Sequence, residues 1–424
     1  MTVPPVRAWL QTTGGVVAML LLVQFVTGIL MAFYYVPSVD HAHTTVSYIE
    51  KVVSSGSWLR SLHHYGSQWL SVVAFIHVIR LFLDRAYTTN RTQWIVAILL
   101  LGLVMAAGGT GFSLPWDARA FFSTRIAEGL MAGLPLFGRM ARLWLLGGSD
   151  ISTLTLSRFF GLHVLLIPAL IVVAVLWRMW GLNIAKLFGP RHAIAAGVVF
   201  LALALWCLKY PAPLGPSVAE MTPEYLPRPG SQFLWLYQSL KYIPGGLGSI
   251  TGVVLPGIVL TVLILLPWLK RARLIGGSLL GAGVVVVLLM TTAAYLSDRR
   301  DPGTREQLSK QVAAEEAWRH EPFNPVRLTL ASASAPAPAG TPAMYIEFCA
   351  NCHGQNGEGA RQGRLNFPPL LDVAAKPRRT VDDIVGLLKD PTAYGLQPPM
   401  KSFSSKLTEP QMREIAEWIV KLKR

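Results

Sequence analysis

The chain has 424 residues, enough for two or three domains, but only 14% of them are charged and 52% are hydrophobic. This composition is too apolar for a soluble globular protein and predicts that most of the chain lies in lipid. The 38 basic residues outnumber the 23 acidic ones, yet they are scattered among short loops, without an arginine-rich helix or a basic–aromatic stripe. We therefore expect no nucleic acid partner, and we attribute the charge to membrane topology and to contact with anionic membrane lipid.

Apolar runs of the length that crosses a hydrocarbon core, about 20 residues, predict a polytopic bundle of transmembrane helices. Seven such runs lie at 14–34, 64–83, 94–113, 159–179, 193–209, 249–268 and 275–296. The amphipathic stretches within 114–157 and at 231–242 predict short surface helices. The predicted fold class is all-α, with a small all-α domain at the C-terminal end of the chain.

Basic residues in the short loops predict the orientation in the membrane. The loops after the second, fourth and sixth runs hold, respectively, Arg85 and Arg91, Lys186 and Arg191, and Lys270, Arg271 and Arg273. By the positive-inside rule these loops are cytoplasmic. Seven crossings then deliver residues after 297 to the outer side, which we expect to be the periplasmic side of a bacterial cytoplasmic membrane.

Residues 298–340 are charged at first and then rich in alanine and proline, a composition that predicts a surface helix followed by an extended tether. We assign this segment as a linker and residues 341–424 as a separate domain. That domain opens with Cys349-Ala350-Asn351-Cys352-His353, the C-x-x-C-H pattern of covalent haem attachment. Two thiols on one helical turn can add to the haem vinyl groups, and the next imidazole becomes an axial ligand. We expect one covalent haem c, with His353 on its iron.

Downstream of this motif the sequence resembles small class-I cytochromes c. In that family a methionine from an irregular loop before the last helix is the sixth iron ligand. The loop Gln397-Pro398-Pro399-Met400 precedes a predicted amphipathic helix at 409–423. The resemblance therefore implies that Met400 is the second ligand of haem c.

The second apolar run carries His63 and His77, fourteen residues apart. Fourteen residues make nearly four helical turns, so both imidazoles project from one face, roughly 21 Å apart along the axis. This separation suits two haems stacked across the membrane, whereas a single intramembrane histidine is often structural.

These histidines stand among motifs that resemble cytochrome b of the cytochrome bc family, the quinol:cytochrome c oxidoreductases. The motifs are Gly14 and Gly28, Trp58-Leu59-Arg60-Ser61-Leu62-His63, Ile76-His77-Val78-Ile79-Arg80, Gly111-Phe112-Ser113-Leu114-Pro115-Trp116-Asp117, and Leu156-Ser157-Arg158-Phe159-Phe160-Gly161-Leu162-His163. The resemblance divides the membrane part into a four-helix region at 1–190 and a three-helix region at 191–297.

The resemblance also implies the ligands of an outer haem b, namely His63 and His163. Gly14, Gly28 and Gly111 would let haem edges approach the helix backbones, and Arg60 and Arg80 would lie in the haem surroundings. His64 would be a propionate or hydrogen-bond partner.

The inner haem site departs from the family pattern. His77 should pair with a histidine fourteen or fifteen residues after His163, but Trp177 and Arg178 stand there, and Ala97 replaces the family's inner glycine. Gly14 and His77 indicate that the site has not vanished. Two alternatives remain open. Either a second haem b is present, five-coordinate or with Met179 or His192 as a substitute ligand, or that haem is absent.

The quinol-oxidising motif of the family, Pro-Glu-Trp-Tyr, is also missing. Residues 229–232 stand in its place as Pro-Gly-Ser-Gln, without the glutamate that would accept a quinol proton. Glu224, and likewise Glu220, is a candidate replacement, against the simpler interpretation of solvated loop carboxylates.

Two functions follow from these features. One is an electron-transfer subunit of a bc-type complex that connects a quinone pool or partner redox subunits with haem b and haem c, without standard quinol bifurcation. The other is a complete quinol:cytochrome c oxidoreductase subunit, whose partner would be a separate Rieske iron–sulfur protein. Quinol bifurcation with recycling of the second electron across the membrane needs both the inner haem ligand and the quinol-site glutamate. Because both are missing, the first function is favoured. Expected partners are redox subunits such as a Rieske protein or a multihaem cytochrome, and a soluble electron acceptor.

Overall fold

The computed structural model divides into two compact units, Met1–Phe323 and Asn324–Arg424. It describes residues 6–180, 189–222, 224–243 and 247–323 of the first, and 340–354, 357, 359–362, 365–367, 369–370, 380–394, 402–404 and 406–422 of the second. The division falls inside the predicted linker 298–340. The part of that segment up to Phe323 belongs to the membrane unit, because it packs there as a helix.

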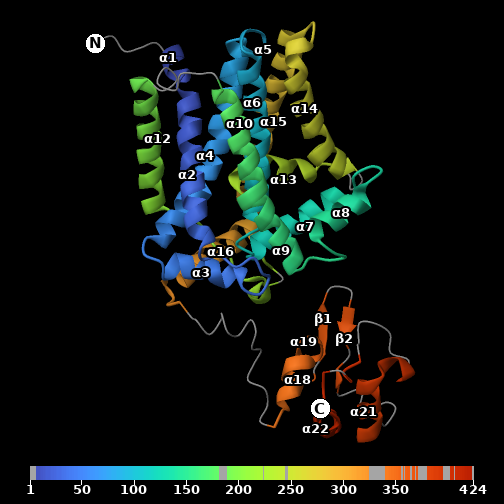
Figure 1. The fold of residues 1–424 in the computed structure, drawn as a ribbon. Helices are drawn as coiled ribbons and strands as arrows, with labels where there is room; N and C mark the ends of the chain where they lie inside the picture. Colours follow the sequence, from blue (N-terminus) through green and yellow to red (C-terminus); the bar gives the residue numbers. More distant parts are fainter. Residues whose placement is uncertain are drawn as a thin grey trace. The chain divides into compact units, whose positions relative to one another are not determined.

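Within the described part of the chain, seven helical spans are long and apolar enough to cross a membrane, which confirms the seven predicted runs. The spans contain α2 (Thr13–Ala32), α4 (Gly56–Leu83), α6 (Arg91–Phe112), α9 and α10 (Thr153–Gly161 and Ile167–Met179), α12 (Pro190–Lys209), α14 (Leu255–Leu265) and α15 (Ala272–Arg300). In Figure 1 they form a bundle, with α2 beside α4 and α12, α4 beside α6, and α6 beside α10 and α14.

Two spans contain a π-helical turn just before a proline. Leu162–Leu166 precedes Pro168, and Ile250–Val254 precedes Pro256. Proline has no N–H and its ring crowds the carbonyl four residues earlier, so the regular helical ladder cannot continue unchanged there. The first of these turns contains His163, so this histidine lies at a local widening of its helix.

The two ends of the bundle differ in their short helices. One end carries α3 (Ala42–Lys51), α7 (Ala118–Ala132) and α8 (Gly138–Leu146), and we call it the His63 half. The other carries α1 (Val6–Leu10) and α5 (Ala86–Thr89), and we call it the His77 half. Helices α7, α8 and α13 (Leu234–Leu240) occupy the segments predicted to hold surface helices.

Buried apolar side chains fill the bundle in two clusters. One joins α2, α4, α10 and α12 around Leu20, Leu70 and Leu203. The other joins α4, α6, α14 and α15 in the His77 half around Val78, Trp94 and Leu263. The indole of Trp94 is fully buried and donates its N–H to the carbonyl of Leu263 at 2.7 Å.

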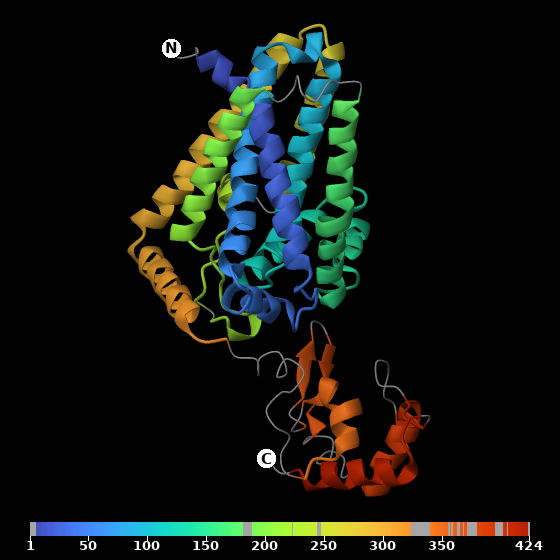
Figure 2. The same cartoon turned by 60° about the vertical axis from the view of Figure 1, so that its left-hand side comes forward.

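Helix α16 (Pro302–His320) follows α15 directly and begins at Asp301, whose carboxylate accepts the N–H of Thr304 at 2.7 Å. The predicted surface helix is thus present. In Figure 2 it is the orange helix that turns back toward the bundle where α15 ends. Its contacts with the bundle are described below.

The second unit is helical around one small core. It contains α18 (Ala343–Phe348), α19 (Ala350–His353), α21 (Val381–Lys389) and α22 (Glu409–Lys421), together with a short antiparallel ribbon of β1 (Ala360–Gln362) and β2 (Leu365–Phe367). Tyr345, Ile384, Met412 and Ile415 lie at the centre of its core. The all-α fold class is confirmed, and the ribbon is a minor addition to it.

Candidate haem sites

The structure brings His63 and His163 together from opposite sides of the bundle. His63 lies on α4 and His163 in the π-helical turn before α10. Their ring centroids are 5.9 Å apart and their planes differ by 76°. Both rings line a cavity of about 380 Å³, which Gly28 and Gly111 line as well.

The Nδ1 atom of each imidazole has a protein partner. Nδ1 of His163 lies 3.0 Å from the carbonyl oxygen of Ala107, which can only accept, so the proton is on Nδ1. Nδ1 of His63 lies 2.9 Å from Oγ1 of Thr27. Because that hydroxyl gives its hydrogen to the carbonyl of Val23 at 2.6 Å, it accepts from His63. In both rings Nε2 therefore carries the lone pair, the state that binds a metal ion.

His77 has the same surroundings in the other half of the bundle. Its Nδ1 lies 2.9 Å from Oγ1 of Thr13, which donates to the carbonyl of Leu10 at 3.0 Å. Arg80 lies beside it, with Nη2 3.4 Å from Nδ1 of His77 and Nη1 3.3 Å from the carboxylate of Asp84. The threonine contact of His63 is thus repeated at His77, with a cationic side chain beside the same nitrogen.

A threonine–glycine pair faces each of these histidines. A Cβ added to Gly14, Gly28 or Gly111 would lie 3.3, 3.1 or 2.5 Å from Cε1 of His77, His63 or His163, respectively. Each glycine thus makes room for the imidazole itself, where the family resemblance implied room for a haem edge. Each is preceded by a threonine whose hydroxyl contacts the same ring, at 3.4 Å for Thr110 and His163.

These threonines were missed by the sequence reasoning, although a signal was present. Thr13-Gly14 and Thr27-Gly28 are fourteen residues apart on α2, the spacing that separates His77 from His63. Fourteen residues before Thr110-Gly111 on α6 stands Val96-Ala97. Val96 and Ala97 are only 2% and 6% exposed, and Ala97 packs in the apolar cluster of the His77 half. The missing fourth pair thus coincides with the missing fourth histidine.

One of the two proposed substitutes for that histidine, His192, contacts another side of α2 than His77 does. His192 on α12 packs on Gly15, where an added Cβ would lie 3.1 Å from its own Cβ. His77 packs on Gly14, and adjacent helix positions point about 100° apart, so the two histidines contact different sides of α2. Met179 ends α10, and Trp177 is 48% exposed. Among the described residues, the His63 half therefore has two imidazoles that face one cavity, whereas the His77 half has one imidazole on the corresponding face of α4.

Polar side chains line the His63 cavity together with the two histidines. They include Arg60, His64, Ser67, Asp117, Arg119 and Gln232. His64 accepts from the amide of Gln68 at 3.0 Å, and Gln68 accepts from Oγ of Ser231 at 2.5 Å. The segment 229–232, which stands in place of the family's quinol motif, is thus joined to the cavity by hydrogen bonds.

The two loop carboxylates lie elsewhere. Glu220 and Glu224 are exposed, and Glu220 accepts from Oγ of Ser217 at 2.8 Å. Among the described residues that line the cavity, neither glutamate is present. This placement favours the simpler interpretation of solvated loop carboxylates.

The second unit holds the C-x-x-C-H motif at the start of its core. Cys349 separates α18 from α19, and its carbonyl accepts the N–H of His353 at 2.9 Å, so the motif forms one helical turn. Cys349 is buried beside Tyr345, whose hydroxyl donates to the carbonyl of Gly354 at 2.5 Å. Cys352 lies on α19, as double attachment requires. Met400 lies outside the described residues.

Comparison with known proteins agrees with both parts of the chain. Residues 1–186 match the family model described as Cytochrome b/b6/petB, and residues 341–423 match the cytochrome c model. Cytochrome b6 of Prochlorococcus marinus (strain NATL1A) is 33% identical over 189 residues, 44% of this chain and 87% of that relative. Cytochrome b of Rickettsia prowazekii (strain Madrid E) is 29% identical over 297 residues, 64% of this chain and 73% of that relative.

A chain of a solved hyperthermophilic respiratory Complex III has the same fold, with a TM-score of 0.53 and 20% identity over 73% of this chain and 89% of that one. The opposed histidines, the seven apolar spans and the sequence matches agree on one assignment. The chain belongs to the cytochrome b/b6 family and carries a cytochrome c domain at its C-terminal end.

Proposed function

We propose that this chain is the membrane electron-transfer subunit of a cytochrome bc-type complex, with one bis-histidine haem b in the His63 half and one covalent haem c. Electrons pass between the quinone pool or partner redox subunits, haem b and haem c, without standard quinol bifurcation. The observation that supports this proposal is that the two halves differ in their histidines and threonine–glycine pairs. Three histidines have threonine–glycine partners, while the fourth position has lost both.

The residues of the chain have separate tasks in this function. Haem bound in the cavity supplies reversible one-electron chemistry. Thr27 and the carbonyl of Ala107 hold the two imidazoles with Nε2 available to iron, and Gly28 and Gly111 leave room for the rings. Cys349 and Cys352 attach haem c, with His353 and Met400 on its iron.

The positive-inside pattern supports an orientation with the His63 half and the cytochrome c domain on the outer, periplasmic side of a bacterial cytoplasmic membrane. Haem b and haem c are then on the same side. Partner subunits such as a Rieske protein or a multihaem cytochrome, and a soluble acceptor, would exchange electrons there.

The ratio of haem b to haem c in the purified chain tests the proposal. A ratio of one is expected, and it is incompatible with a standard cycle that recycles the second electron across the membrane. A ratio of two, with low-spin bis-histidine spectra for both b haems, would refute the proposal.

One observation supports quinol oxidation as a second candidate function. Gln232 is one of the cavity-lining residues, and its Oε1 is buried and has no hydrogen-bond partner in the described structure. A quinol hydroxyl could donate to it. Quinol-dependent reduction of haem b should then fall in Gln232→Leu and remain unchanged in Glu224→Gln. Loss of the rate in Glu224→Gln would instead identify Glu224 as the proton acceptor.

A further inference from the structure

Helix α16 contacts the His63 half from its middle to its C-terminal end. Just before this helix, Asp298 at the end of α15 forms an ion pair with Arg228 at 2.6 Å. In the middle, Gln311 exchanges two hydrogen bonds with the backbone of Leu226, at 2.8 and 3.1 Å. At its C-terminal end Lys51 donates to the carbonyls of Trp318 and Glu321 and lies 3.9 Å above the Trp318 ring. Such a helix has a fixed position on the bundle.

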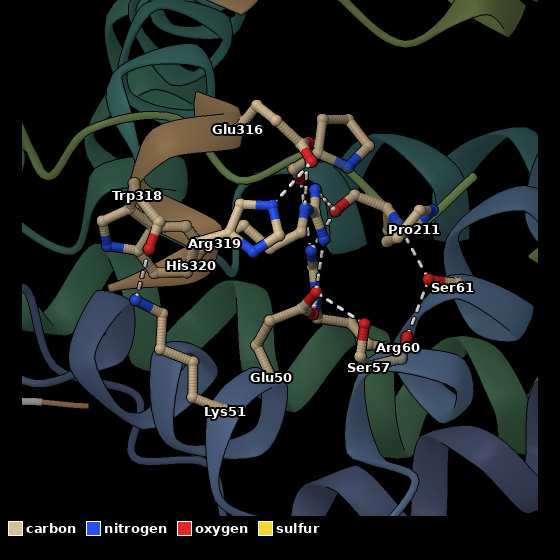
Figure 3. A network of polar contacts seen from close by, with 12 residues as sticks. Glu50, Lys51, Ser57, Arg60, Ser61, Pro211, Glu316, Trp318, Arg319 and His320 are labelled. Carbon is tan, nitrogen blue, oxygen red and sulfur yellow. Dashed lines mark hydrogen bonds and ion pairs between the residues drawn. The ribbon is translucent and has the colours of Figure 1, made fainter. Parts of the chain in front are cut away.

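Glu50 on α3 is the centre of the contact at the C-terminal end of α16 (Figure 3). Its side chain is 2% exposed and lies between two arginines, Arg60 at 2.6 Å and Arg319 at 2.7 Å. Oγ of Ser57 also donates to it, at 2.7 Å. Burial alone would raise the pKa of Glu50, but Arg60, Ser57 and Arg319 together lower it, so the carboxylate is ionised.

Arg60 connects this contact with the haem cavity. Its guanidinium is bound by Glu50 and by the carbonyls of Ala212 and Pro213, and Arg60 is one of the cavity-lining residues. Arg319 of α16 therefore acts on the cavity through Glu50, whose charge both arginines share.

The other arginine of the cavity is bound to α16 directly. Arg119 at the start of α7 forms an ion pair with Glu315 and donates to the hydroxyl of Tyr225 at 3.2 Å. Glu315 and Arg319 are four residues apart and lie on one face of α16. A single helix face thus contacts one cavity arginine, Arg119, directly and the other, Arg60, through Glu50.

We propose that α16 is an electrostatic positioning element for the haem b site, in which Glu315 and Arg319 set the net charge that Arg119 and Arg60 present to the cavity. The inference rests on the proposed haem b at His63 and His163. Reduction adds one negative charge to the haem, so a positive charge nearby stabilises the reduced form and a negative charge disfavours it. Glu315 and Arg319 are positioning residues that act on the haem potential in opposite directions.

The midpoint potential of haem b in the purified full chain, measured by redox titration, tests the proposal. Glu315→Gln removes the counter-charge of Arg119 and should raise the potential. Arg319→Gln leaves Glu50 with one cation fewer and should lower it. We expect each variant to change the reduction equilibrium by roughly three- to tenfold, as for a charge pair at intermediate dielectric.

Two further variants separate charge from structure. Arg319→Lys keeps the charge and should retain the wild-type potential. Lys310→Gln removes a charge from an exposed pair with Glu306 on the same helix and should leave the potential unchanged, because water screens it. Equal shifts in one direction for Glu315→Gln and Arg319→Gln, or no shift in either, would overturn the proposal.

Hydrogen exchange of residues 302–320 supplies a readout that does not depend on haem. The amides of α16 should be protected in the wild-type chain and in both single variants, since the contacts of Gln311 and Lys51 remain. Unprotected amides in the wild-type chain would refute the docked helix. A chain without any haem b would refute the proposed function instead, while protection of α16 would be unaffected.

Discussion

The two halves of the helix bundle have the same arrangement of residues on α2 and α4 but differ on α6 and α10. In the His63 half, α2 and α6 each present a threonine–glycine pair to an imidazole, and the two imidazoles face one cavity. In the His77 half, α2 repeats this arrangement around His77, but α6 presents Val96-Ala97, and Trp177 and Arg178 stand where the opposing histidine belongs.

This difference teaches that a haem ligand and its supporting residues are lost together. Once no imidazole occupies the space beside residue 97, a methyl group and apolar packing are more stable there than a glycine and an empty gap. The valine before it needs no hydroxyl, since there is no Nδ1 to contact. Thr13, Gly14 and His77 keep their contacts, and we call these three residues the half site.

Removal of the axial histidines should separate the two halves most strongly. His63→Ala or His163→Ala is expected to abolish haem b, so that the ratio of haem b to haem c falls from one to nearly zero in a pyridine haemochrome assay. His77→Ala should leave the ratio at one. A ratio that drops by half in His77→Ala would show that the two halves are more alike than their contacts indicate.

Rebuilding the missing side should create a second site. The π-helical turn that contains His163 adds about one residue to the spacing, so position 178, rather than 177, reaches the face opposite His77. The combination of Val96→Thr, Ala97→Gly and Arg178→His is expected to raise the haem ratio from one to two. Trp177→His in the same background is the matched control and should leave it at one, because its side chain points about 100° away.

The threonines should have graded effects on haem retention. Hydrogen-bond partners of metal-bound histidines typically change affinity by roughly ten- to a hundredfold. Thr27→Val should weaken haem b binding within this range, as measured by haem transfer to an apo-acceptor protein. Thr13→Val has the same chemistry in the half site and should not change the transfer rate. Equal rates in the two variants would contradict a functional role for Thr27.

Acid should weaken the contact between α16 and the rest of the His63 half. This is the smallest of the four predicted effects. Because the pKa of Glu50 is lowered in the folded chain, its ionised form stabilises the fold above the ordinary carboxyl pKa. That stabilisation is lost as the pH falls through the lowered value. The protection of the α16 amides relative to their intrinsic exchange rate at each pH should therefore fall at pH values below the usual glutamate range, and Glu50→Gln should remove this dependence. An unchanged pH profile in Glu50→Gln would exclude Glu50 as the acid-sensitive contact.

Much of this architecture could be predicted from local sequence patterns. Apolar runs determine the seven spans because lipid demands about 20 apolar residues per crossing. The spacing of Cys349, Cys352 and His353 and that of His63 and His77 follow from the helical period. The absence of a histidine near residue 178 is likewise visible without a structure.

Contacts between distant residues required the tertiary structure. Arg319 binds Glu50 across 269 positions of the chain, and nothing in the local sequence of residues 298–323 distinguishes a docked helix from a charged linker. The charge of α16 predicts a surface helix, but its partners Glu50, Arg119 and Leu226 come from three separate segments. The sequence by itself determined which histidines are candidate haem ligands, because ligand spacing is a local property. Only the tertiary structure decided which threonine contacts each ring and which helix contacts Arg119 and Glu50, because ion pairs and hydrogen bonds join residues regardless of their separation in the chain.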